Sequence, residues 1–404
     1  MALPPVVAIE IGTTKVVALV GEMRDDGTIY IVGKGEHPSS GVRKGEVIDL
    51  DNALVCLRSA ITSAEETGRV TCNQVYLAVS GGHIQSLSNR GTIPVRKPEV
   101  GITDDDVTQV TDIARTVNLP PDRQVLHSIW QTFYVDGQPC RRPKGFDASQ
   151  LTLDMLILHG RRVQLRNTVK VVTSLNVEVC DMAFSGICSA MAVLTPEQKE
   201  GGALVIDFGG GTTNYVAYAA GALAAAGSFG IGGDHVTNDI ALAFNIQRNQ
   251  AERLKIERGG ARVEESARSE RITVPAEVGY PERRIALSAL QKVINLRTVE
   301  TVNLIRRALE RDGLLHAIGA GVVITGGAAQ LRGLRELTEE IFKSPCALGK
   351  SVGVSGLASA LQGPQYTTAV GLVRYAFTRS AREESGWVKG LFRRIGLLPQ
   401  GVAS

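Results

Sequence analysis

Two short segments, about 200 positions apart, share one arrangement of residues that is suited to binding phosphate. Residues 9–15 read IEIGTTK, and residues 206–214 read IDFGGGTTN. In each segment an apolar stretch carries a carboxylate, Glu10 or Asp207, and is followed by glycine and two threonines. Glycine lets backbone N–H groups approach a phosphate closely because no Cβ intervenes, and threonine hydroxyls add donors. A carboxylate at this place can hold a hydrated Mg²⁺ against the phosphates. The pair predicts two facing loops that clamp a triphosphate.

A third segment extends this hypothesis to a whole nucleotide. Residues 322–334 read VVITGGAAQLRGL, and two adjacent glycines there let a flat adenine or ribose lie against bare backbone. Each segment alone is more often an ordinary turn, but the three together favour a nucleotide site. No GxxxxGK[ST] motif occurs, which excludes a P-loop.

The predicted nucleotide-binding residues come from these three segments and from one further turn. They are Gly12, Thr13, Thr14, Lys15, Gly209, Gly210, Gly211, Thr212, Thr213, Gly233, Asp234, Gly326, Gly327 and Ala328. Asp234 has two interpretations, because it either approaches the nucleotide or caps the helix that begins there. Glu10 and Asp207 are the candidates for positioning Mg²⁺ or a water, and no firm catalytic residue is predicted.

Composition excludes several classes of protein. The chain has 404 residues, of which 44% are hydrophobic and 21% charged, so it can form two to three domains and is not disordered. Its six cysteines include no CxxC pair, which excludes a zinc ribbon and fits a reducing cytoplasm. The residues from Arg379 onward include five basic and two acidic ones, and they account for the whole net charge of +3. The folded body is therefore neutral overall, and no nucleic-acid partner is expected.

Hydrophobic patterning predicts an α/β chain with one insertion of different character. Strand–turn–strand units are expected over residues 6–20 and 203–218. Helices are expected over residues 50–66, 181–194, 234–245, 286–309 and 330–342. Residues 86–165 combine a helix opened by a Thr103 capping box with two strand-like stretches, which predicts a small α+β insertion.

The C-terminal segment has the pattern of an amphipathic helix. One face of residues 386–398 is apolar and the flanking positions are basic. The predicted membrane-binding residues are Trp387, Val388, Lys389, Leu391, Phe392, Arg393, Arg394, Ile395 and Leu398. Aromatic residues suit the lipid headgroup boundary, and each basic residue adds about 1 kcal/mol of attraction to anionic lipid. The alternative is a terminal helix that docks on the protein's own core.

The three glycine-rich segments resemble, in order, the phosphate-1, phosphate-2 and adenosine motifs of the superfamily of actins, sugar kinases and DnaK-type chaperones. Within that superfamily the chain is similar to the FtsA family of bacterial cell-division proteins over essentially its whole length. The resemblance is greatest over residues 10–22, 75–86, 192–214, 232–241 and 367–376. The sequence departs from the usual patterns at Glu10, where most of the superfamily has Asp, at Asn214, which replaces an Asp, and at residues 295–297, which read Asn-Leu-Arg in place of Glu-Pro-Arg.

The resemblance implies a two-lobed actin-like (ribonuclease-H-like) α/β ATPase fold with a small α+β inserted subdomain and a C-terminal amphipathic helix. It implies the following division of the chain: a first lobe of residues 1–85, 166–198 and 362–378, an insertion of 86–165, a second lobe of 199–231 and 310–361, a tip of 232–309, a linker of 379–385 and a tail of 386–404.

The resemblance also implies a function. We expect an ATP- and Mg²⁺-binding division protein, with at most slow ATPase activity, that polymerises and binds anionic lipids. It is expected to tether the FtsZ ring to the cytoplasmic face of the membrane at the division site and to help recruit later division proteins. Arg253, Lys255 and Arg258, on an exposed part of the tip, are the predicted contacts for the C-terminal tail of FtsZ. Two alternatives are a pilus-assembly scaffold and a small-molecule kinase, although no catalytic Asp facing a sugar-sized pocket is recognisable.

Overall fold

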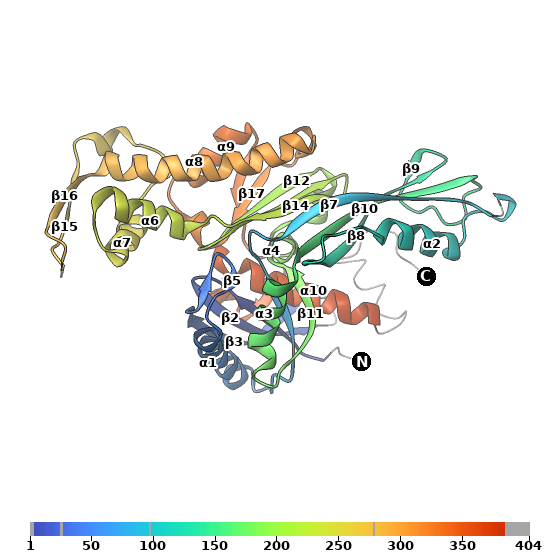
Figure 1. Ribbon diagram of the computed structural model, residues 1–404, viewed down its shortest axis with the longest axis horizontal. Coiled ribbons are helices and arrows are strands. Elements are labelled where there is room, and N and C mark those ends of the chain that lie inside the picture. Colours follow the sequence, from blue (N-terminus) through green and yellow to red (C-terminus); the bar gives the residue numbers. More distant parts are fainter. Residues whose placement is uncertain (1–3, 25–26, 97, 278, 384–404) are drawn as a thin grey trace.

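The computed structural model describes residues 4–24, 27–96, 98–277 and 279–383, and it consists of two lobes with a lateral insertion (Figure 1). The sheet of the first lobe has the strand order β11-β6-β1-β2-β3-β19. Its strands are β1 Val6–Ile11, β2 Lys15–Met23, β3 Ile29–Pro38, β6 Gln74–Val79, β11 Glu178–Phe184 and β19 Val354–Gly356. A two-stranded hairpin follows β3 and consists of β4 Val42–Arg43 and β5 Glu46–Val47.

The sheet of the second lobe repeats this plan. Its order is β14-β13-β12-β17-β18. The strands are β12 Ala203–Phe208, β13 Thr213–Ala219, β14 Ala222–Phe229, β17 Val322–Thr325 and β18 Cys346–Leu348. In both lobes three successive strands pair in antiparallel fashion. A fourth strand pairs in parallel with the first of these three, and a fifth strand pairs in parallel with the fourth. The repeat seen in the two phosphate-loop sequences is therefore a repeat of topology.

Four helices pack against the first lobe. They are α1 Leu50–Gly68, α3 Arg162–Thr173, α4 Ser185–Val193 and α10 Thr367–Glu383. α1 begins at an Asp49 cap that accepts the Asn52 N–H at 3.1 Å. α1 then lies directly on β3, where a Cβ at Gly35 would collide with the carbonyl oxygen of Ala60. Only glycine fits there.

The insertion is a small unit with its own core. Its sheet, β7-β10-β8-β9, is covered by α2 Asp104–Arg115 and lies on the right in Figure 1. The strands are β7 Gln85–Pro94, β8 Arg123–Val135, β9 Gln138–Cys140 and β10 Gln150–Arg161. The predicted capping box is confirmed, since Thr103 accepts the Asp106 N–H and donates its own N–H to the Asp106 carboxylate. The insertion also touches the second lobe, where Ser86 Oγ donates to Ala226 O at 2.6 Å.

The tip of the second lobe forms a separate small core at the opposite end (Figure 1). Its elements are α6 Gly233–Phe244, α7 Arg248–Arg258, β15 Arg271–Val274, β16 Arg283–Ala286 and α8 Leu287–Arg311. α8 continues past the tip and packs against α9 Leu334–Phe342 of the second lobe. A short helix, α5 Pro196–Glu200, precedes β12.

Some boundaries differ from the sequence predictions. Residues 181–184 belong to strand β11, and the helix expected from residue 181 begins at Ser185 instead. Residues 354–356, which the predicted division assigns to the second lobe, pair with β3 in the first sheet. Residues 379–383, expected in the linker, continue helix α10. The predicted membrane helix lies outside the described residues. In the part of the chain that is described, no helix is long and apolar enough to cross a membrane.

Candidate nucleotide site

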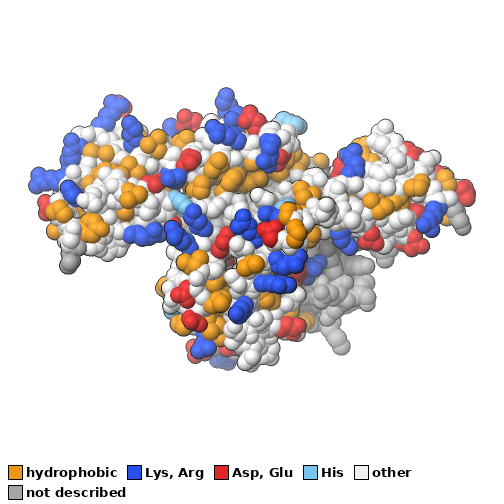
Figure 2. Space-filling view, viewed as in Figure 1, with side chains coloured by type: hydrophobic (Ala, Val, Ile, Leu, Met, Phe, Trp, Pro, Cys, Tyr) orange, Lys and Arg blue, Asp and Glu red, His pale blue; other side chains and the backbone are white. Residues whose placement is uncertain are grey.

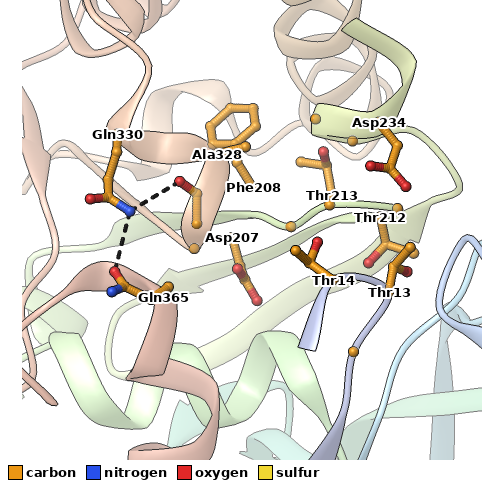
Figure 3. Close-up of a pocket in the computed structure, with 18 of the residues that line it drawn as sticks. Thr13, Thr14, Asp207, Phe208, Thr212, Thr213, Asp234, Ala328, Gln330 and Gln365 are labelled. Atoms are coloured by element: carbon orange, nitrogen blue, oxygen red, sulfur yellow. Dashed lines mark hydrogen bonds between the residues drawn. The ribbon is translucent and has the colours of Figure 1, made fainter. Parts of the chain in front are cut away.

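A cavity of about 1060 Å³ lies between the lobes and collects the predicted site residues. Its walls include Gly12, Thr13, Thr14, Lys15, Gly209, Gly210, Gly211, Thr212, Thr213, Gly233, Asp234, Gly326, Gly327 and Ala328. Figure 3 shows Thr13 and Thr14 of the first lobe opposite Thr212 and Thr213 of the second, with Asp207 between the loops and Ala328. The structure therefore brings all three glycine-rich segments to one place.

The two phosphate loops have the same turn. The Gly12 N–H donates to Lys15 O at 3.0 Å, and the Gly209 N–H donates to Thr212 O at 2.9 Å. The loops also approach each other so closely that a Cβ on Gly210 would collide with the Thr14 hydroxyl. The glycines thus let the two turns approach each other, and the threonine hydroxyls of the first turn lie beside the backbone of the second, an arrangement suited to an anion.

The first turn of α6 is fixed to the second loop. The Gly233 N–H donates to Gly209 O at 3.0 Å, and the Asp234 N–H donates to Gly210 O at 2.8 Å. Asp234 does not cap this helix, because the N-cap position is Gly232 and the Asp234 carboxylate pairs with Arg248 at 3.2 Å. Asp234 lines the cavity, and its approach to a nucleotide stays a prediction.

The two carboxylates are buried and differ in their partners. Asp207 Oδ2 accepts hydrogen bonds from Ser189 at 3.0 Å, from Thr368 at 3.2 Å and from Asn214 at 3.4 Å. Burial nevertheless raises the pKa of Asp207. Glu10 Oε2 is buried and has no hydrogen-bond partner among the described residues. Burial, with the nearby Asp207 charge, raises the pKa of Glu10 to about 8.

This pair of acids fits a hydrated divalent cation. A buried carboxylate oxygen without a partner is costly, and a cation or a proton would relieve that cost. Two protein carboxylates leave most coordination positions to water and phosphate oxygens, which is the usual arrangement for Mg²⁺. Within the described part of the chain, no group of three or more His, Cys, Asp or Glu side chains is placed to hold a metal by itself.

The third segment supplies a flat wall. Gly326 has φ +87°, and a Cβ there would collide with Asp207 and with the Phe208 carbonyl. The Gly326 N–H donates to Pro364 O at 3.1 Å, which joins this segment to the 3-10 turn Pro364–Tyr366 before α10. Gln330 donates to Gln365 at 3.2 Å beside it (Figure 3). At Gly327 a Cβ would meet nothing closer than 3.7 Å, so a planar group has room to lie there.

Several cavity residues were not predicted as part of the nucleotide site, among them two charged residues of α7. Glu252 and Lys255 lie on α7 and line the cavity. Lys255 was expected on an exposed partner surface, but its side chain is only 13% exposed. Its ammonium donates to Gly233 O at 3.1 Å, to Thr237 Oγ1 at 2.9 Å and to Glu252 at 2.7 Å. The sequence signal for this pair was a Glu and a Lys three positions apart on one helix face. It was not recognised because the surrounding stretch is rich in charged residues and was interpreted as a solvated surface.

Sequence comparisons identify relatives along nearly the whole chain. The family described as Cell division protein FtsA matches residues 204–371, and the SHS2 domain inserted in FTSA matches residues 81–159. The chain is 35% identical to Cell division protein FtsA of Pseudomonas aeruginosa, over 95% of this chain and 92% of the relative. It is also 35% identical to Cell division protein FtsA of Escherichia coli K12, over 92% of this chain and 90% of the relative.

Solved structures with the same architecture have low sequence identity. The PilM–PilN type IV pilus biogenesis complex superposes with a TM-score of 0.64 at 15% identity, covering 92% of this chain and 98% of its own. MreB5 of Spiroplasma citri bound to ADP gives 0.56 at 15% identity, covering 95% of this chain and 99% of its own. These likenesses, with the matched insertion, confirm the predicted actin-like two-lobed fold.

The raised pKa of Glu10 predicts a pH dependence of stability. The folded protein keeps the Glu10 proton up to about pH 8, whereas the unfolded chain loses it near the ordinary glutamate value of 4.5. The free energy of unfolding should therefore fall between about pH 4.5 and 8, by up to about 1.4 kcal/mol per pH unit from this group. Urea unfolding of the nucleotide-free protein at pH 6, 7 and 8 measures this slope.

Glu10→Gln should flatten the slope, because glutamine does not titrate. Glu66→Gln, at an exposed position of α1, is the matched control and should keep the wild-type slope. An unchanged slope in Glu10→Gln would show that other groups cause the dependence.

Proposed function

The chain belongs to the FtsA family of cell-division proteins, and from this premise we propose that it binds ATP with Mg²⁺ in the cleft and acts in division as a membrane tether. In this proposal it assembles with copies of itself and attaches the FtsZ ring to the cytoplasmic face of the membrane. The observation that carries nucleotide binding is the pair of facing phosphate loops beside the unpartnered Glu10 oxygen. Identity to relatives named as division proteins favours this function over a pilus role, since the pilus neighbour is only 15% identical. Nothing at the cavity favours a small-molecule kinase.

Each part of the cavity has a proposed role. Residues 12–14 and 210–213 would surround the phosphates. The Gly12 N–H and the Thr213 hydroxyl, which donate to Lys15 O and Ile231 O, would fix the loops, and the other amides and hydroxyls of these residues would bind the phosphates. Glu10 and Asp207 would hold Mg²⁺ through water, and the metal would supply positive charge against the phosphates. Gly326 and Gly327 would lie against the adenosine. Glu252 would offer a carboxylate acceptor to ribose hydroxyls, and Lys255, whose three N–H donors are engaged by Gly233, Thr237 and Glu252, would hold that carboxylate in place. The MreB5 neighbour, whose structure is bound to ADP, supports a nucleotide in this fold.

The proposed membrane attachment starts from a rigid part of the protein. Near the end of α10, the Arg379 guanidinium donates to Asp181 at 2.7 Å, and the Tyr375 hydroxyl donates to the same carboxylate at 2.8 Å. Asp181 lies on β11 of the first sheet. The proposed tail, residues 386–404, therefore follows within a few residues a helix that is fastened to the body. Such an arrangement would transmit the orientation of the membrane helix to the first lobe.

The proposed site for the FtsZ tail is a hollow at the tip. A cavity of about 440 Å³ lies between α7 and β15, and its walls combine apolar side chains, including Leu254 and Ile272, with Arg253 and Arg258. Arg258 pairs with Glu270, whereas Arg253 is exposed. Figure 2 shows Lys and Arg side chains among apolar ones at this end of the molecule. A partly acidic, partly apolar peptide matches such a surface.

Gly210→Val tests the phosphate clamp. The branched side chain would collide with Thr14 and fill the space between the loops, so ATP affinity in the presence of Mg²⁺ should fall at least about a hundredfold, or ~2.7 kcal/mol. Isothermal titration measures the affinity, and thermal unfolding verifies that the variant is folded. Gly201→Ala, where a Cβ makes only ordinary contacts, should bind as the wild type does. Unchanged affinity in folded Gly210→Val would rule out the clamp.

Deleting residues 386–404 tests membrane attachment. Co-sedimentation with anionic liposomes should be lost, and Trp387→Glu should reduce the pelleted fraction several-fold because it places a carboxylate at the headgroup boundary. Gln400→Glu adds the same charge outside the predicted apolar face and should pellet like the wild type. Equal pelleting of the full-length and the truncated protein would favour a tail helix docked on the body.

Arg253→Glu tests the tip as the FtsZ site. Reversing one exposed charge beside the hollow should weaken binding of a labelled FtsZ tail peptide about tenfold, as measured by fluorescence anisotropy. Arg307→Glu, at another exposed position, on α8, is the matched control. Lys255 is not a suitable test position, because its replacement would also disturb the nucleotide cavity. Equal weakening by both variants would point to a general charge effect and not to this hollow.

A further inference from the structure

Four side chains form a compact network at the edge of the nucleotide cavity. Lys15 and Lys34 both lie over the ring of Tyr366, with their ammonium nitrogens 3.5 and 4.3 Å from its centroid. Glu36 is the one carboxylate within salt-bridge distance of either lysine in the described part of the chain. The Tyr366 hydroxyl donates to Glu36 Oε2 at 2.8 Å and accepts from Lys34 at 3.1 Å.

The Glu36 carboxylate lies closer to Lys34 than to Lys15. Lys34 is 3.0 Å from Glu36 Oε2, at hydrogen-bond distance, while Lys15 is 3.5 Å from Oε1. The Tyr366 hydroxyl occupies the same oxygen as Lys34. Lys15 is therefore held mainly by the ring face, through a cation–π contact, and only weakly by the carboxylate.

The position of Lys15 makes its weak pairing with Glu36 relevant to ligand binding. Lys15 ends the first phosphate loop and lines the cavity together with Glu36 and Tyr366. The charged and titratable groups that face Lys15 are Glu10 on β1, Lys34 and Glu36 on β3, and Tyr366. Burial lowers the pKa of Lys15, although the charges of Glu10 and Glu36 oppose this shift. The neighbours of Lys15 balance its positive charge only in part. An anionic ligand in the cavity would therefore stabilise the charged form of Lys15.

Tyr366 also connects this network to the opposite wall of the cavity. It belongs to the 3-10 turn Pro364–Tyr366, whose Pro364 carbonyl accepts the Gly326 N–H at 3.1 Å. Tyr366 itself is only 9% exposed, so its ring has little freedom to move. The ring thus has a fixed place between the first phosphate loop and the third glycine-rich segment.

We propose that Tyr366 is a positioning residue for nucleotide phosphates: its ring holds the Lys15 ammonium toward the cavity, and its hydroxyl keeps Glu36 engaged with Lys34. Without the hydroxyl, Glu36 is freed to pair with Lys15 and to withdraw that charge from the phosphates. The inference rests on the proposed binding of ATP in this cavity, and it assigns a role to the phosphate end of the ligand only. The adenosine end should not depend on it.

A rescue experiment separates this role from simple packing. Tyr366→Phe keeps the ring and removes the hydroxyl, and it should weaken binding of ATP with Mg²⁺ about tenfold, the range of a hydrogen bond to a charged group. Adding Glu36→Gln to Tyr366→Phe should restore the affinity to within about twofold of Glu36→Gln alone. Adenosine, which has no phosphates, should bind all variants equally. Tyr30→Phe, on the same strand as Glu36 but outside the cavity lining, is the matched control.

The outcomes distinguish the inference from the function on which it rests. If the wild type binds ATP but Tyr366→Phe binds equally well, or if Glu36→Gln does not restore the affinity, the positioning role is wrong while the nucleotide site stands. Equal weakening of adenosine and ATP by Tyr366→Phe would likewise overturn it, because that pattern indicates damage to the cavity as a whole. If the wild type binds no ATP, both proposals fail.

Discussion

The close approach of two glycine-rich turns across the cleft constrains the rest of the structure. Gly210 and Gly211 face the Thr13 and Thr14 hydroxyls without room for a Cβ. Backbone turns can meet in this way only if the strands that carry them are held in fixed positions, and each turn joins the first two strands of a buried sheet. The five-stranded arrangement that the two lobes share is one solution to that requirement, because it presents the same turn from both sides.

The two lobes repeat the same topology, but the carboxylates Glu10 and Asp207 differ in their hydrogen-bond partners. Asp207 is satisfied by Ser189, Asn214 and Thr368, whereas one oxygen of Glu10 has no partner in the described structure. The glutamate therefore supplies the unsatisfied acceptor of the site, and its burial, together with the charge of Asp207, raises the pKa of Glu10. Asn214 contributes to this difference, because its side-chain amide donates a hydrogen bond to Asp207. An acid at position 214 would instead repel the Asp207 carboxylate.

Local sequence was sufficient to predict the parts of the site that depend on backbone conformation. Glycine pairs, a strand-to-turn pattern and a capping box are short-range signals, and the residues of all three loops line the cavity as expected. Contacts between distant segments were not accessible in this way. Lys255 is 22 positions from Gly233, and only the packing of α7 against α6 brings them together. Strand β19 pairs with β3 across more than 300 positions, and its three residues carry too little pattern to predict that pairing.

The same packing gives the cavity a physical link to the end of the chain. The turn Pro364–Tyr366 borders the cavity and leads directly into α10, which packs against α4 and β1 of the first lobe. The far end of α10 is fastened to β11 through Arg379 and Asp181. One helix therefore begins beside the cavity and ends at Glu383, shortly before residue 386, where the sequence predicts that the membrane segment begins. A ligand that alters the contacts of Tyr366 would act on the residue that directly precedes that helix, and the helix itself is packed along α4. The fold therefore connects the cleft to Glu383 through one helix that is packed against the first lobe.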